Sequence, residues 1–187
     1  MVCMTVNTRE NTCVDSILIL IYFAMIPISP KPLERLRRTI ASKKVALIGL
    51  GNRNMGDDGM GPKLVQRLKG RVNALTYETH GGLEAVLSSI PADRPELVVV
   101  VKAVELGRKP GETTLLNENM LDSNGVGKQA RDVRLLMRYI EKESGTPAIL
   151  LVVQPGTVTL TNRLSDAVYN SVKTLENFFL EILGKKP

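Results

Sequence analysis

The chain has 187 residues, a formal net charge of +6 and 43% hydrophobic residues, which is typical of a globular protein with one sizeable core. It has no Trp and only 4% aromatic residues, which argues against a surface that stacks single-stranded nucleic acid. The densest basic cluster, within residues 35–44, has no interleaved aromatic residue. We therefore interpret the positive charge as a solvated surface and expect no nucleic-acid partner.

Cysteine usage indicates a reducing compartment. The only two cysteines are Cys3 and Cys13, and they do not form a CxxC pair. A disulfide framework and a thiolate zinc site are both unsupported by this pattern. We expect the protein to be cytoplasmic.

The N-terminal part contains an apolar run from Ile17 to Ile26 that is shorter than the ~18 residues of a membrane span. The run is not preceded by a basic region, as a signal peptide would be. Three interpretations remain: translation that naturally begins at Met25, a packing segment, or a membrane anchor. We favour the first and expect no membrane span. Residues 1–43 are treated as an N-terminal extension or linker, and 44–187 as the domain.

Strand and helix patterns alternate along the rest of the chain. A short basic helix is predicted over Leu33–Ala41, and a buried strand over Val45–Ile48 runs into a glycine-rich turn. A helix can begin at Pro62, where the missing N–H costs nothing. Further strands are predicted at 72–78, 97–101, 113–116 and 148–153, and further helices at 83–90, around 133–140 and at 164–183. This alternation predicts a three-layer α/β/α domain with a mostly parallel sheet.

The most informative segment is Gly49 to Pro62, with the sequence GLGNRNMGDDGMGP. A dinucleotide-binding fingerprint requires glycine where Asn54 stands. A phosphate-binding P-loop requires lysine where Asp57 stands, and carboxylates there would repel phosphate. A nucleotide-binding α/β protein is therefore disfavoured.

Asp57 and Asp58 follow the first strand and precede a helix. The carboxyl edge of an open α/β sheet is where ligands bind, and carboxylates placed there can hold metal ions. The alternative is structural: one of the two carboxylates caps the helix that follows.

This segment resembles the N-terminal signature of the hydrogenase maturation endopeptidases, in which a Gly-Asn pair is followed by an acidic pair and a glycine-rich helix start. The resemblance continues, in the family's order, through His80-Gly81-Gly82, the stretch Leu97 to Glu112 and Val153-Gln154-Pro155. It covers about Lys44 to Leu183 and implies the fold of these proteases.

The resemblance also implies an activity. The family consists of aspartic-type hydrolases that remove a C-terminal extension from the large-subunit precursor of nickel–iron hydrogenases after nickel insertion. The implied partner is that precursor, and the implied metal is nickel that arrives with the substrate. Of the family's three metal-contacting residues, the second acid of the acidic pair corresponds to Asp58, which the resemblance makes both catalytic and metal-contacting.

The other two family residues are not present. The third-strand aspartate is replaced by Lys102, and the loop at Asp122–Arg131, where the family has a histidine, has none. An ammonium group has no lone pair for a metal and repels a cation. The only histidine, His80, is predicted at a strand end and is a candidate second metal ligand; the alternative is an ordinary surface or hydrogen-bonded histidine.

Three interpretations of Lys102 remain: an ion pair with Asp57 or Asp58, a buried neutral amine, or a side chain turned to solvent. We favour the ion pair, with Glu105 as an alternative partner. The main functional alternative to the protease is a noncatalytic relative that binds a precursor or assembly partner without cleaving it. The intact acidic pair favours the enzyme, whereas Lys102 and the missing loop histidine favour the noncatalytic relative.

Overall fold

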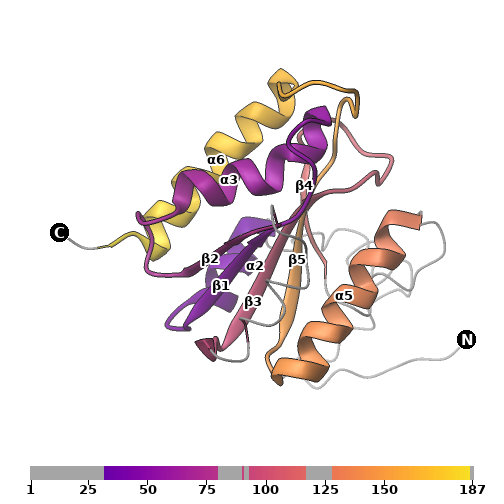
Figure 1. Ribbon diagram of the computed structural model, residues 1–187. Helices are drawn as coiled ribbons and strands as arrows, with labels where there is room; N and C mark the ends of the chain where they lie inside the picture. The colour runs from indigo at the N-terminus through magenta and orange to yellow at the C-terminus, as the bar shows by residue number, and fades with distance from the viewer. Residues whose placement is uncertain (1–31, 80–89, 91–92, 117–127, 186–187) are drawn as a thin grey trace, which may run out of the picture. The chain divides into compact units, whose positions relative to one another are not determined.

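The computed structural model describes residues 32–79, 90, 93–116 and 128–185 (Figure 1). The chain divides into two compact units, Met1–Lys31 and Pro32–Pro187, and all described residues belong to the second. The description below concerns this second unit.

A five-stranded sheet forms the centre of the unit. Its strands are β1 (Val45–Gly49), β2 (Leu75–Glu78), β3 (Leu97–Ala103), β4 (Thr113–Leu116) and β5 (Ala148–Val153), in the order β2-β1-β3-β5-β4. Only β4 runs antiparallel to its neighbour, β5. The sheet is therefore mostly parallel, as predicted.

Helices cover both faces of the sheet (Figure 1). The helices α2 (Pro32–Ile40), α3 (Met60–Leu68) and α6 (Asp166–Leu183) share one core cluster, and α5 (Lys128–Ser144) lies in the other. Strand β3 shows why the two clusters exist: Val99 and Val101 join the first, whereas Val98 and Val100 join the second. Successive side chains of a strand point to opposite faces, so an all-apolar strand supplies two cores. The predicted three-layer α/β/α fold is confirmed.

Several element boundaries differ from the prediction. Strand β2 begins at Leu75 rather than at Val72, because Val72 forms a bridge with Gly184 beyond the end of α6. Helix α3 begins at Met60, directly after a 3-10 turn over Gly56–Gly59. The predicted helix at 83–90 lies outside the described residues except at Ile90.

The start of the compact unit also differs from the predicted domain boundary at 44. The unit begins at Pro32, because Leu36 and Ile40 of α2 are fully buried in the core shared with α3 and α6. Among the described residues, no helix has the length and hydropathy needed to cross a membrane.

The turn after β1 requires glycine for a steric reason. Gly51 has a φ of +136°, a conformation that side chains disfavour, and a Cβ added there would lie 1.8 Å from the carbonyl oxygen of Asp58. The backbone at Gly51 therefore lies directly against the backbone of Asp58, and there is no room for a methyl group between them. This close approach holds Asp58 in place over the end of the strand.

We expect Gly51→Ala to lower the free energy of unfolding by at least about 3 kcal/mol, because the backbone must move to admit the methyl group. Gly70→Ala is the matched control: its φ is +78°, but a Cβ there would meet nothing within 4 Å. Its cost should be only about 1 kcal/mol of backbone strain. Urea denaturation of both variants checks the prediction, and equal costs would show that the close approach does not matter.

Candidate functional site

The candidate site lies at the carboxyl edge of the sheet, between β1 and β3. Strand β1 is flanked by β2 on one side and β3 on the other, so the connections leave β1 and β3 in opposite directions at this point. Such a switch point is where open α/β sheets bind ligands. The loop with Asp57 and Asp58 follows β1, and Lys102 lies near the end of β3.

Asp58 and Lys102 form an ion pair across this switch point. The Lys102 Nζ atom lies 3.0 Å from Asp58 Oδ1, and the two side chains are 16% and 20% exposed. The second carboxylate oxygen, Oδ2, accepts a hydrogen bond of 2.6 Å from the backbone N–H of Asn52. The predicted ion pair is therefore confirmed with Asp58 as the partner, and both oxygens of this carboxylate are engaged.

Glu105, the alternative partner for Lys102, is occupied elsewhere. Its carboxylate accepts hydrogen bonds from the side-chain amide of Gln154 at 2.7 Å and from the N–H of Gly107 at 3.0 Å. Gln154 is only 2% exposed and also accepts from the backbone of Leu106. Glu105 thus orders the turn after β3 and does not compete with Asp58.

Asp57 is fully buried and joins the first loop to a distant one. Its Oδ2 atom accepts hydrogen bonds from the N–H groups of Gly156 at 2.8 Å and Thr157 at 2.9 Å, and from the Ser165 hydroxyl at 2.8 Å. Its Oδ1 atom accepts from the Ser165 N–H at 2.7 Å. Ser165 is the N-cap of α6, so the carboxylate sits at the positive end of that helix.

Hydrogen bonding keeps Asp57 ionised in spite of its burial. Burial alone raises the pKa of this carboxyl, but the hydrogen bonds from Thr157, Ser165 and Gly156 outweigh burial and leave the pKa below its ordinary value. The structural alternative from the sequence, that one acid caps the next helix, is wrong, because the N-cap of α3 is Gly59 with no side-chain cap bond. Asp57 stabilises the start of the distant α6 instead.

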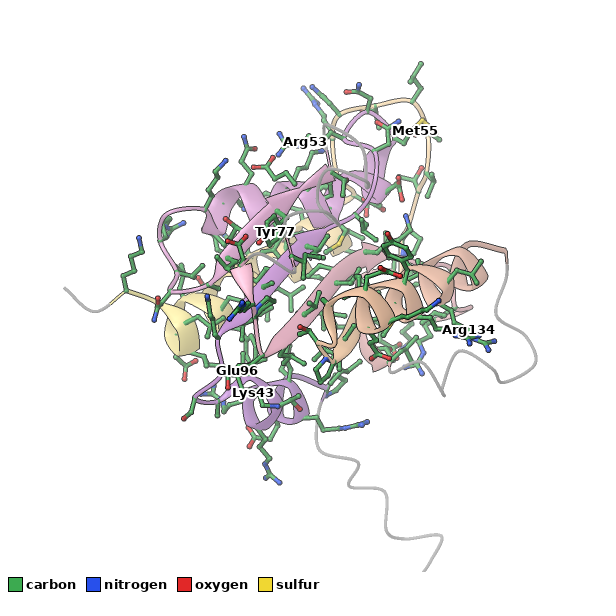
Figure 2. All side chains as sticks on the ribbon, turned by 60° about the horizontal axis from the view of Figure 1, so that its bottom comes forward. Lys43, Arg53, Met55, Tyr77, Glu96 and Arg134 are labelled. Carbon is green, nitrogen blue, oxygen red and sulfur yellow. The ribbon has the colours of Figure 1, made fainter. Side chains whose placement is uncertain are left out.

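A second ion pair borders the site on the side of β2. Arg53 donates to Glu78 at 2.7 Å and to the carbonyl oxygen of Pro62 at 3.2 Å, and the two paired side chains are 24% and 17% exposed. Beside it lies a pocket of about 270 Å³ whose lining includes Asn52, Asn54 and Thr79. Figure 2 shows Arg53 and Met55 on the loop that rises above the end of the sheet.

Comparisons with known proteins give one consistent result, although no family model matches the chain. The hydrogenase 3 maturation protease of Escherichia coli strain K12 is 26% identical over 139 residues, which cover 71% of this chain and 88% of that protein. The crystal structure of the NiFe hydrogenase maturation protease HycI from Thermococcus kodakarensis KOD1 is 26% identical, with a TM-score of 0.68, and covers 80% of this chain and 98% of that one.

The chain is thus similar in sequence and in fold to hydrogenase maturation proteases. The hydrogenase maturating endopeptidase HybD from Escherichia coli shares the fold at 15% identity, with a TM-score of 0.60 over 74% of this chain and 90% of that one. The family resemblance seen in the sequence is thereby confirmed.

The described residues do not make a site for a resident metal ion. No group of three His, Cys, Asp or Glu side chains comes together in the described part of the chain. Asp58 offers its oxygens to Lys102 and Asn52, so a metal would have to displace an ammonium group that repels it. His80 and the loop at 122–127 lie outside the described residues, so the metal role of His80 stays a prediction.

Sequence reasoning did not identify the partners of Asp57 or the Arg53–Glu78 pair. The donors to Asp57 come from a loop that the sequence marks only by Gln154-Pro155-Gly156 and by a serine before the last helix. A serine before an apolar periodic segment is an N-cap signal, and it was the one available clue to Ser165. Nothing in the sequence connected that serine to Asp57.

Proposed function

We propose that this protein is an endopeptidase that removes the C-terminal extension of the large-subunit precursor of a nickel–iron hydrogenase. The observation that carries the proposal is the position of Asp58. The acidic pair that resembles the family signature stands at the switch point of a fold that spans 98% of the Thermococcus HycI chain. The proposed partner is the precursor, and the proposed location is the cytoplasm.

In this proposal Asp58 is the catalytic residue. Its carboxylate is oriented by the Asn52 N–H and by Lys102, so it needs little reorganisation to meet a substrate segment at the sheet edge. The nickel belongs to the substrate, and Asp58 would contact it only when the precursor displaces Lys102 from Oδ1. The protein itself supplies the carboxylate, its orientation and the surrounding loops.

A specific observation supports an alternative function. Lys102 places a positive charge 3.0 Å from the carboxylate that would otherwise meet the metal. Breaking a partly buried ion pair costs several kcal/mol when one partner is left unpaired. If the precursor does not offset this cost, the protein binds it, or another assembly partner, without cleaving it.

Intact-mass measurement of a nickel-loaded large-subunit precursor from the same organism tests the proposal. We expect loss of a C-terminal fragment with the wild-type protein and a rate at least about 100-fold lower with Asp58→Ala, as for other residues acting directly on the reacting group. Glu143→Ala, at an exposed glutamate on α5, is the control and should cleave at the wild-type rate.

The other outcomes separate the two functions. Stable binding of the precursor without cleavage would support the noncatalytic relative. If the wild-type protein neither binds nor cleaves the precursor, both proposals are wrong. Cleavage that is unaffected by Asp58→Ala would remove Asp58 from the catalytic role.

A further inference from the structure

A groove of about 440 Å³ runs between α3 and the loop that leads into α6. Its charged lining consists of three cations, Lys63, Arg67 and Arg163, and one carboxylate, Asp166. Tyr169 adds a half-exposed ring, with the Arg67 guanidinium 5.4 Å from its centre. The groove is thus amphipathic, and its cations outnumber its carboxylate.

Most of this positive charge is not neutralised within the described part of the chain. Lys63 donates to the carbonyl oxygen of Asn162, and no described carboxylate lies within ion-pair distance of Lys63 or Arg163. Arg67 is the exception, with Glu176 at 3.3 Å. Burial is the main cause that lowers the pKa of Lys63, and the neighbouring charges of Arg53 and Arg67 lower it further.

The groove lies near the turn that carries the acidic pair. Two charged residues of that turn and the loop before it act on Lys63: Arg53 lowers the pKa of Lys63, and Asp57 raises it. Lys63 belongs to α3, which starts directly after the turn that carries Asp57 and Asp58.

The loop beside the groove exposes apolar side chains on a fixed backbone. Leu160 is 85% exposed and Val158 is 47% exposed. The loop is nevertheless held at both ends of this stretch: Asp57 binds Thr157, and Thr161 exchanges backbone hydrogen bonds of 2.7 Å with Gly56 and 2.9 Å with Asn54. A rigid loop that presents apolar side chains to solvent loses little entropy when a partner covers them.

We infer that the groove and the exposed loop together bind a peptide segment of the precursor that carries acidic and apolar side chains. Carboxylates of the segment pair with Lys63 and Arg163, and its apolar side chains cover Leu160 and Val158. The identity of the partner rests on the proposed function, whereas the chemistry of the bound segment rests on the charge and exposure of these residues.

Peptide binding tests the surface directly. The probe is a short fluorescent peptide of Glu and Leu residues, with a Lys and Leu peptide as its charge-reversed counterpart, followed by fluorescence anisotropy. We expect the acidic peptide to bind more tightly, and Arg163→Glu and Leu160→Ser each to weaken its binding at least tenfold. Raising the salt concentration should also weaken binding, because exposed charges are screened.

Two matched controls lie on α5, on the opposite face of the sheet. Lys142→Glu reverses an exposed charge, and Leu135→Ser removes a leucine that is 64% exposed. Both should bind the acidic peptide within twofold of the wild type. If the groove variants bind like these controls, or both peptides bind equally well, the inference is wrong.

The same four variants, assayed with the precursor, separate this inference from the proposed function. Normal cleavage with a higher KM for the groove variants alone would support both. Cleavage at an unchanged KM in every variant would overturn the docking surface and leave the proposed function standing. Peptide binding through the groove, with a wild-type protein that neither binds nor cleaves the precursor, would overturn the precursor as partner together with the proposed function.

Discussion

Replacing Asp57 by asparagine is expected to lower the free energy of unfolding by about 3 kcal/mol or more. The four donors to this carboxylate come from Gly156, Thr157 and Ser165. The asparagine amide would direct N–H groups at some of these donors, and each buried donor left without an acceptor costs roughly 1–3 kcal/mol. Urea denaturation of the variant and the wild type measures the loss.

Asp166→Asn is the matched control for this substitution. Asp166 is exposed in the first turn of α6, next to Ser165, where its carboxylate interacts favourably with the helix dipole. Its loss should cost at most about 1 kcal/mol. Equal effects of the two substitutions would show that the buried hydrogen-bond network around Asp57 does not stabilise the fold.

The pH dependence of stability gives a second readout of Asp57. Because its pKa in the folded state is below the ordinary value, ionised Asp57 stabilises the fold above roughly pH 4. That stabilisation disappears as the pH falls through the folded-state pKa. The stability difference between the wild type and Asp57→Asn should therefore be constant near neutral pH and shrink in acid, as urea denaturation at a series of pH values would show.

Lys102→Asp is expected to raise the affinity for nickel(II) at least tenfold, which corresponds to ~1.4 kcal/mol. The substitution removes the ammonium group that lies 3.0 Å from Asp58 Oδ1 and adds a second carboxylate at the same strand end. Unit charges about 4 Å apart interact by roughly 4 kcal/mol near a protein surface, so reversing one of them is more than enough for this gain. Isothermal titration calorimetry measures the affinity.

Two further variants identify the source of the gain. Lys102→Met removes the positive charge without adding a ligand and should recover only part of the affinity. Lys102→Asp combined with Asp58→Asn keeps the new carboxylate but weakens the old one, and should lose most of the gain. Unchanged nickel affinity in Lys102→Asp would show that Lys102 does not block this position.

Asp57 and Asp58 thus have different roles although they are neighbours in the chain. Asp57 is fully buried and fixes the loop that carries Val158 and Leu160. Asp58 is 20% exposed and faces the switch point of the sheet. A defect in Asp57 should therefore appear first in stability, and a defect in Asp58 first in cleavage.

The sequence by itself determined the fold class, the order of the elements and the position of Asp58. The continuous apolar runs of β1, β3 and β5 place apolar side chains on both faces of the sheet. Both faces must therefore be buried, as they are in a parallel sheet between two layers of helices. The ion pair between Asp58 and Lys102, which lie 44 residues apart in the chain, was also predicted, because both residues were placed at strand ends.

Only the tertiary structure decided which acid stabilises the fold and which one faces the site. The donors to Asp57 lie 99 to 108 residues away, and no local pattern links two loops so distant in sequence. The basic groove has the same origin, because Lys63 and Arg163 meet only when α3 and the loop before α6 pack side by side. Periodicity and turn signals are local, whereas the partners of a buried charge are chosen by the packing of the whole sheet and its helices.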